Sequence, residues 1–375
     1  MIVPEFPIVG IRDLFSKSKS RFYSEMQHKM IFTFLGRGAV FQAIEALELK
    51  TDDIVLVPSY HCGVEIEAIL MNNARIQYYN INKNLQIDMQ DFEKKIINGN
   101  VKAALIIHYY GFPQDIVSIS KLCRKKNVVL IEDCSHSHLS HYGDKRLGTF
   151  GDLAIFSFRK MLPLSNGGGL LMNRKYPINE KEAVTPGRFF IAKSAIGSYL
   201  RYHRSMVHLY NAFQLVNSRL RAGRFIVNEQ TPSTGMGVSE INCRTKISPS
   251  MKNIIKHCDD LKIEKLRRTN YILMQKTLHK QKWISEIYER LENGNVPLCF
   301  PLRINNGKRD EFERILKDKG VQSYIFGKNL HPSLSREKYR DAHLLSAQII
   351  GIPIHQKINQ ATIVKIAGII NRTEL

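Results

Sequence analysis

The chain has 375 residues, of which 43% are hydrophobic, and a formal net charge of +21 at pH 7. This length suits one large α/β domain with a smaller second domain. No window comes near the roughly eighteen uninterrupted apolar residues of a membrane span. The first residues also lack the pattern of a secretion signal. We therefore expect a cytoplasmic protein with no transmembrane segment.

The six cysteines are scattered, and no two of them form a CxxC pair. Disulfide frameworks and zinc sites have characteristic spacings, so the sequence predicts a reducing compartment and no metal site. The positive charge has several explanations. It could bind nucleic acid, an anionic membrane surface or a phosphorylated substrate, or it could simply be a solvated basic surface.

Short apolar runs alternate with amphipathic segments between about residues 36 and 173, which favours a mostly parallel sheet with crossover helices. One such helix is indicated by Ala39, Val40, Ala43, Ile44 and Leu47, whose spacing is close to 3.6. The predicted strands are continuously apolar, as strands covered on both faces should be. They span residues 53–59, 75–81, 102–110, 128–133, 153–158 and 168–173.

Two further regions complete the predicted organisation. Residues 1–248 should form the large domain, with a basic helical insertion at about 177–235 that has no Asp or Glu between Val184 and Asn228. That insertion could lie on a membrane surface, form a lip over an anionic substrate, or pack on its own domain or a partner subunit. Residues 249–375 should form a small C-terminal α/β domain, with strands in FPLRI and IGIPIH and a helix that ends at Gly320.

Asp133 ends a predicted buried strand in IEDCSHSH, and His136 follows three residues later. Open α/β sheets bind ligands at the carboxyl ends of their strands, so a carboxylate there is well placed. A strand-ending Asp is also a common helix cap, and a lone His more often makes local hydrogen bonds. Neither residue identifies a site by itself.

Gly36 and Gly38 stand directly before the helical pattern in LGRGAVFQAIEAL. Unpaired N–H groups and the helix dipole suit a phosphate at such a turn, and Arg37 could add positive charge. The stretch is neither a GxGxxG after a strand nor a P-loop, so it is a weak signal alone.

Ser157 ends another predicted strand in SFRKMLPLSNGGG, and Lys160 follows on the turn. A lysine, a phosphate anchor and an Asp at one sheet edge are the set that pyridoxal phosphate requires. The lysine forms a Schiff base, the carboxylate keeps the pyridine nitrogen protonated, and the anchor fixes the phosphate. The sequence therefore predicts a pyridoxal 5'-phosphate cofactor.

Taken together, these segments resemble the DegT/DnrJ/StrS-type sugar aminotransferases, a fold-type-I pyridoxal phosphate family. The resemblance rests on several motifs that occur in the family's order. They are VPSYHCGVEIEAIL, IHYYGFPQDIVSISKLCRKKNVVLIEDCSHS, GTFGDLAIFSF and GGGLLMN, followed by INCRTKISPSM and IPIHQ. The resemblance implies a seven-stranded-type, mostly parallel sheet plus a smaller C-terminal α/β domain.

The resemblance also implies catalytic and cofactor-binding residues. Lys160 would carry the cofactor, Asp133 would pair with the pyridinium nitrogen, and His136 would lie near the ring's phenolic oxygen. The phosphate would be held by Ser157 and by the turn that comprises Gly36, Arg37, Gly38 and Ala39.

A second consequence concerns the neighbouring subunit. Asn242 and Arg244 match a segment that reaches into the partner's site in this family, which implies a homodimer with shared active sites.

The chain departs from the family pattern at three places. The family's lysine usually stands five residues after the serine, where this chain has Leu162, so Lys160 would take its role. Gly167 replaces the usual Glu of the GEGG signature. Cys62 stands where the family has an aromatic residue that stacks on the cofactor ring, so either Tyr60 or His61 stacks instead or no residue does.

The predicted function is transfer of an amino group, with glutamate as the donor, to a keto sugar of a nucleotide-sugar, in cell-surface polysaccharide or related biosynthesis. We expect no nucleic acid partner. Two alternatives stay open. One is a sugar dehydratase-like enzyme that uses the cofactor without a lysine linkage. The other is a degenerate, non-catalytic member that binds polyanions or a partner through its basic surface.

Overall fold

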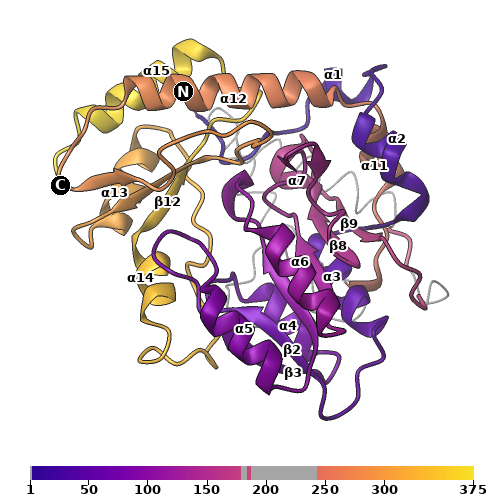
Figure 1. The fold of residues 1–375 in the computed structure, drawn as a ribbon. Coiled ribbons are helices and arrows are strands. Elements are labelled where there is room, and N and C mark those ends of the chain that lie inside the picture. Colours follow the sequence, from indigo (N-terminus) through magenta and orange to yellow (C-terminus); the bar gives the residue numbers. More distant parts are fainter. Residues whose placement is uncertain (1, 179–183, 187–242) are drawn as a thin grey trace, which may run out of the picture.

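The computed structural model describes residues 2–178, 184–186 and 243–375 (Figure 1). The basic helix predicted within 177–235 lies outside the described residues, apart from the first residues of that range. Every helix in the described part of the chain is too short or too polar to cross a bilayer.

A seven-stranded sheet forms the centre of the molecule, in the order β1-β9-β8-β5-β4-β2-β3. The five strands from β8 to β3 in this order are parallel to their neighbours, whereas β9 is antiparallel to both β8 and β1. This confirms the predicted fold class. The strands are β1 Met30–Thr33, β2 Ile54–Pro58, β3 Arg75–Tyr79, β4 Val101–Ile107, β5 Val129–Asp133, β8 Leu153–Ser157 and β9 Gly168–Met172.

All six predicted strands occur, with ends that differ by at most three residues. Strands β5 and β8 are almost entirely buried because helices cover both faces of a sheet with this connectivity. Strand β1 was missed, since its four residues give too short a pattern and it is recognisable only from its pairing with β9.

Helices alternate with the strands as crossover connections in the first part of the chain. The helices there are α1 Ile11–Leu14, α2 Arg21–Met26, η1 Gln27–Lys29, α3 Gly36–Glu45, α4 Val64–Leu70, α5 Met89–Asn98, η2 Tyr109–Gly111, α6 Ile116–Lys125 and α7 Phe158–Met161. A short hairpin, β6 His141–Tyr142 and β7 Lys145–Arg146, precedes β8. The helical pattern around Ala39 is confirmed as α3.

The C-terminal part contains a three-stranded antiparallel sheet, β10-β11-β12, and helices that include the long α12 (Figure 1). The elements are α11 Pro249–Lys256, α12 Asp260–Thr277, β10 Ile284–Glu286, β11 Phe300–Ile304, α13 Arg309–Asp318, α14 Arg340–Gln348, β12 Ile349–Ile352 and α15 Gln360–Asn371. The predicted strands FPLRI and IGIPIH correspond to β11 and to β12 with the residues after it, and the helix before Gly320 is α13.

Contacts between the two parts fix the turn that follows β8. Arg267 on α12 is fully buried and donates hydrogen bonds to the carbonyl oxygens of Met161, at 3.0 Å, and Leu298, at 2.9 Å. Gln356 also donates to the Met161 oxygen, at 2.9 Å. Helix α7, which carries Lys160, is therefore held by the C-terminal part of the chain.

Candidate active site

A pocket lies at the carboxyl ends of β5 and β8, where open parallel sheets bind ligands. Residues of six separate parts of the chain meet in it, and six of the predicted site residues are among them. The lining consists of Leu35, Gly36, Arg37, Val40, Cys62, Val64, Glu65, Ile107, Asp133, Ser135, His136, Ser157, Arg159, Lys160 and Phe326.

The amino end of α3 forms one side of this pocket. The helix has ten residues, so its first N–H groups and its dipole favour an anion there. A Cβ atom on Gly36 would lie 3.3 Å from the Cβ of Ser157, and one on Gly38 would lie 2.6 Å from the carbonyl oxygen of Cys243. Glycine at position 36 therefore lets the end of α3 approach Ser157, and glycine at position 38 leaves room for the Cys243 backbone. Gly38 and the buried Ala39, both predicted to hold a phosphate, are not among the lining residues.

The consecutive glycines after α7 allow β9 to pack closely against the residues that precede α3. A side chain on Gly168 would collide with the backbone of Leu35, because its Cβ would lie 2.4 Å from the Leu35 carbonyl carbon. Gly167 has φ +151° and donates its N–H to the Phe34 carbonyl at 2.7 Å. Close approach of β9 thus positions Leu35, the residue that precedes α3.

Lys160 lines the pocket, whereas Leu162 is fully buried and does not. Its Nζ atom lies 5.6 Å from the ring centre of Tyr324 and 5.8 Å from that of Phe326. No described residue gives this amine a hydrogen bond or an ion pair. Burial lowers the pKa of Lys160; Cys62 and Asp133 partly oppose this effect, and repulsion from Arg159 adds to it.

Asp133 ends β5 and is 7% exposed. Its Oδ1 atom accepts a hydrogen bond from the N–H of Ser135 at 2.8 Å. Oδ2 has no hydrogen-bond partner in the described part of the chain, so this oxygen can accept a hydrogen bond from an N–H or O–H group of a ligand in the pocket.

His136 is held between two parts of the molecule. The Tyr110 N–H donates to its Nδ1 at 3.3 Å, and its Nε2 lies 3.0 Å from the hydroxyl of Tyr324. Burial, helped by the nearby charge of Lys160, lowers the pKa of His136 well below its ordinary value, so the ring is neutral.

Cys62 and Glu65 form a pair in the pocket that the sequence reading did not single out. The Glu65 carboxylate accepts from the Cys62 N–H at 2.8 Å and from its thiol at 2.6 Å. Burial raises the pKa of both groups, and the charge of Glu65 raises that of Cys62 further. A Glu in the first turn of a helix at a strand's carboxyl end was the signal that could have found it.

Tyr60 and His61 were predicted to stack on a cofactor ring, but the structure places neither in the pocket lining. Tyr60 is fully buried and donates its hydroxyl to the Phe326 carbonyl at 2.8 Å. His61 stacks on Tyr78 with ring centres 5.5 Å apart, and burial lowers its pKa to about 3. The aromatic ring that does line the pocket is Phe326, from the C-terminal part.

Of the two residues predicted to reach a partner subunit, Asn242 lies outside the described residues. Arg244 forms an ion pair with Glu45 of the same chain, with one N–O distance of 3.0 Å.

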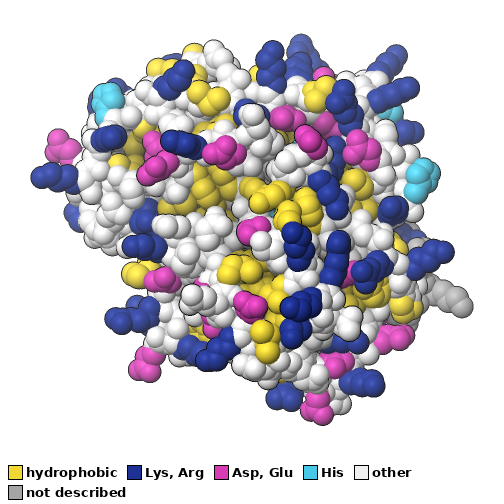
Figure 2. All heavy atoms as spheres, in the orientation of Figure 1, with side chains coloured by type: hydrophobic (Ala, Val, Ile, Leu, Met, Phe, Trp, Pro, Cys, Tyr) yellow, Lys and Arg dark blue, Asp and Glu magenta, His cyan; other side chains and the backbone are white. Residues whose placement is uncertain are grey.

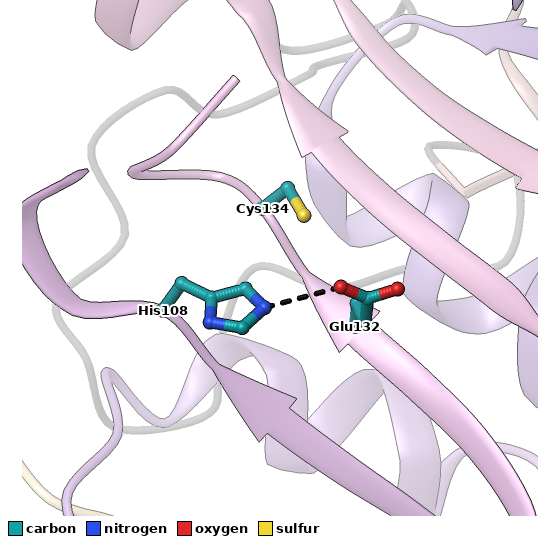
Figure 3. Close-up of side chains that lie close together, drawn as sticks. All are labelled: His108, Glu132 and Cys134. Carbon is teal, nitrogen blue, oxygen red and sulfur yellow. Dashed lines mark hydrogen bonds and ion pairs between the residues drawn. The ribbon is translucent and has the colours of Figure 1, made fainter. Parts of the chain in front are cut away.

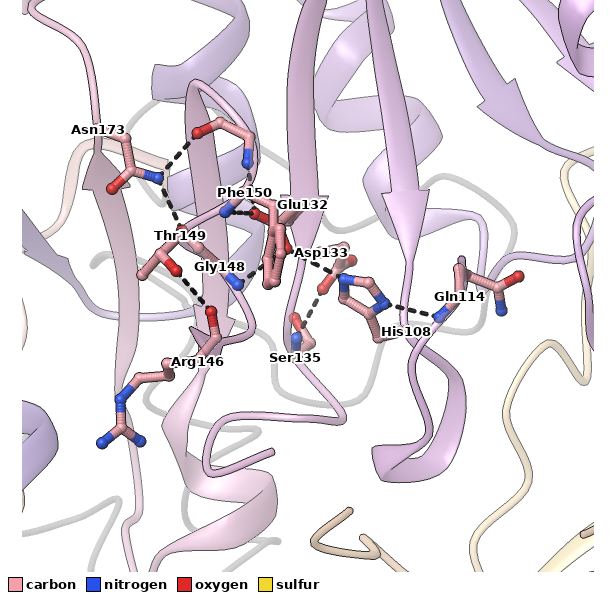
Figure 4. Close-up of polar contacts among 11 residues, drawn as sticks. His108, Gln114, Glu132, Asp133, Ser135, Arg146, Gly148, Thr149, Phe150 and Asn173 are labelled. Atoms are coloured by element: carbon pink, nitrogen blue, oxygen red, sulfur yellow. Dashed lines mark hydrogen bonds and ion pairs between the residues drawn. The ribbon is translucent and has the colours of Figure 1, made fainter. Parts of the chain in front are cut away.

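His108, Glu132 and Cys134 lie close together beneath the sheet edge (Figure 3) and offer atoms of the kind that bind metals. The polar atoms of His108 and Glu132 are already engaged (Figure 4). Glu132 accepts from His108 and from three backbone N–H groups of the turn at residues 148–151, and His108 Nδ1 accepts from the Gln114 N–H. We interpret this cluster as a structural network that holds the turn before β8.

Basic side chains are spread over the face shown in Figure 2, with a group of them over α6, whose last turn carries Arg124 and Lys125. Acidic side chains are interspersed among them on this face.

The fold is an α/β fold built around a mostly parallel seven-stranded sheet. Solved structures share this fold over nearly the whole chain. The aminotransferase TlmJ from Streptoalloteichus hindustanus has a TM-score of 0.68, 18% identity, and coverage of 99% of this chain and 98% of that one. Helicobacter pylori PseC, an aminotransferase involved in the biosynthesis of pseudoaminic acid, has a TM-score of 0.66, 16% identity, and coverage of 98% of both chains.

Residues 20–184 match the model of the DegT/DnrJ/EryC1/StrS aminotransferase family, which confirms the predicted resemblance over this segment. GDP-perosamine synthase of Escherichia coli O157:H7 is 33% identical over 158 residues, 41% of this chain and 43% of that protein. The dTDP-4-dehydro-2,3,6-trideoxy-D-glucose 4-aminotransferase of Saccharopolyspora spinosa is 32% identical over 141 residues, 38% and 37% of the two chains. The chain thus spans about two fifths of the length of these relatives.

Proposed function

We propose that this chain is a pyridoxal 5'-phosphate-dependent aminotransferase that transfers an amino group from glutamate to a keto sugar of a nucleotide-sugar. The observation that carries the proposal is the convergence of Lys160, Asp133 and the α3–Ser157 turn around one pocket. An amine, a carboxylate and an anion-binding turn at one sheet edge are the groups that this cofactor needs.

The residues present fit the cofactor. Gly36 and Ser157 leave space at an amino end of a helix where a phosphate is favoured, with Arg37 beside it. Asp133 Oδ2 would receive the pyridinium N–H, His136 would face the ring, and Lys160 would hold the cofactor covalently. When bound, the cofactor supplies an electron sink for the loss of a proton from the substrate's reacting carbon.

The chain's own residues would then handle the proton. The lowered pKa of Lys160 favours its neutral amine, which is the form that acts as a nucleophile and as a base. Asp133 stays close enough to stabilise positive charge in the pocket. Phe326 and Tyr324 cover Nζ with aromatic rings and limit the access of water.

The names of the relatives and the charge of the chain support the proposed substrate class. Both curated relatives described above have names that refer to nucleotide-linked sugars. The net charge of +21 suits a substrate that carries a diphosphate. We place the reaction in cell-surface polysaccharide or related biosynthesis, in the cytoplasm, with Asn242 of a homodimer completing the neighbouring site.

The test is an absorbance spectrum of the purified protein with pyridoxal phosphate, followed by borohydride reduction and peptide mapping. We expect a stable adduct on Lys160 and transamination of a nucleotide keto sugar. Lys160→Ala should lose both, whereas Lys102→Ala, at an exposed position of β4, should keep both. Bound cofactor with no covalent adduct would instead indicate a dehydratase-like enzyme, and full activity of Lys160→Ala would refute the assignment of the lysine.

A further inference from the structure

The hydroxyl of Tyr324 contacts His136, although the two residues are 188 positions apart in the sequence. His136 belongs to the loop after β5, and Tyr324 follows α13 in the C-terminal part. Their atoms Nε2 and Oη lie 3.0 Å apart. Neither the sequence pattern nor the family resemblance pointed to Tyr324.

The direction of this hydrogen bond follows from the other nitrogen of the ring. The Tyr110 backbone N–H can only donate, and it points at His136 Nδ1 at 3.3 Å. Nδ1 must therefore be the acceptor. A neutral imidazole has one N–H group, so Nε2 carries the hydrogen and donates it to the Tyr324 hydroxyl.

Tyr324 is itself fixed in place on its own side. Its backbone N–H and carbonyl pair with those of Gly351 in β12, at 2.8 and 2.7 Å. The ring of Phe6 packs on the Tyr324 ring with centres 4.9 Å apart. A hydroxyl that is anchored to a sheet in this way has little freedom to move away from His136.

The same side chain also faces the candidate cofactor-linking lysine. Lys160 Nζ lies 5.6 Å from the ring centre of Tyr324, within the range of a cation–π contact when the amine is charged. Tyr324 thus contacts His136 and lies close to Lys160, while Phe326, two residues further on, lines the pocket from the C-terminal part of the chain.

We propose that Tyr324 is a positioning residue: its hydroxyl accepts the Nε2–H of His136 and fixes the plane of that ring, and its own ring lies beside Lys160. The proposal rests on the proposed function only in so far as His136 then presents a fixed ring plane to the bound cofactor. The consequence is that the site is complete only when the C-terminal part is docked.

The direct test is ¹⁵N NMR of histidine-labelled protein, with the His136 signal assigned by its loss in His136→Asn. In the native protein we expect the neutral Nε2–H tautomer. Tyr324→Phe keeps the aromatic ring but removes the acceptor of the Nε2–H, so it should shift the His136 Nε2 signal. The control is Tyr339→Phe, which also removes a buried hydroxyl, one that donates to the Tyr78 carbonyl at 3.0 Å, and it should leave the His136 signal unchanged.

Two results would overturn the proposal: an Nδ1–H tautomer in the native protein, or an unchanged His136 signal in Tyr324→Phe. The first result is measured on the native protein, so it tests the proposal even if Tyr324→Phe folds poorly. In the loaded enzyme, Tyr324→Phe should keep the Lys160 adduct, shift the cofactor's absorbance, and lower kcat about tenfold with little change in KM, as loss of an orienting partner of a histidine does elsewhere. Absence of any adduct in the native protein would defeat the proposed function but leave the tautomer result standing.

Discussion

The guanidinium of Arg267 donates to the carbonyl oxygen of Met161 across 3.0 Å, and through this contact α12 holds the turn that carries Lys160. The same guanidinium donates to Pro297 and Leu298 oxygens at 3.2 and 2.9 Å, and to Gln356. Burial lowers the pKa of Arg267 to about 9. A cation is thus buried with carbonyl and amide partners, which makes its removal costly.

Arg267→Met should destabilise the protein by about 3 kcal/mol, because several buried oxygens lose a charged donor. Urea denaturation measures this loss. Arg268→Met, at the next position of α12, removes donors to the Glu292 and Asn295 oxygens at the surface, and it should cost less. Equal losses in the free energy of unfolding would show that the buried contacts of Arg267 stabilise the protein no more than the surface contacts of Arg268.

Labelling of Lys160 by trinitrobenzenesulfonate in cofactor-free protein should follow a pH midpoint below 10.5, the ordinary value for lysine, because burial disfavours the charged amine. Asp133→Asn should move this midpoint lower still, since the Asp133 charge raises the pKa of Lys160. Peptide mapping after labelling at each pH gives the midpoint. Asp144→Asn, in the exposed turn between β6 and β7, should leave it unchanged. An upward shift in Asp133→Asn would contradict the geometry of the pocket.

Gly168→Ala should destabilise the protein by about 1–3 kcal/mol, because the new methyl group would collide with the Leu35 backbone, which cannot move without displacing α3. Affinity for pyridoxal phosphate, measured by fluorescence, should fall with it. Gly10→Ala is the control, since its Cβ would meet only Asp13 Oδ2 at an ordinary 3.4 Å. If Gly168→Ala is less stable but binds pyridoxal phosphate with unchanged affinity, the close approach of β9 does not determine the shape of the anion site.

Glu65→Gln should speed the alkylation of Cys62 by iodoacetamide at pH 8. The Glu65 charge raises the pKa of the Cys62 thiol in addition to burial, so its loss increases the thiolate fraction. Mass spectrometry of the Cys62 peptide over time measures the rate. Glu67→Gln, two residues further along α4, changes a carboxylate that forms no hydrogen bond with Cys62 in the described structure, and it should behave like the native protein. A slower reaction in Glu65→Gln would mean that the carboxylate activates the thiol instead.

The pattern of the sequence was sufficient for most of the fold. Continuous apolar runs identify β2, β3, β4, β5, β8 and β9 because a parallel sheet is buried on both faces. The motif order also indicated Lys160, Asp133, Ser157 and the turn at Gly36, because polar residues at the carboxyl ends of parallel strands must meet at one edge.

Tertiary structure alone decided which neighbours of these residues enter the pocket. Tyr60, His61 and Cys62 are consecutive, yet only Cys62 lines it, because Tyr60 packs on Phe326 and His61 stacks on Tyr78 instead. Glu65, Tyr324 and Phe326 join the site through a helix start and through docking of the C-terminal part. Such long-range contacts depend on packing between elements, and no local period in the sequence encodes them.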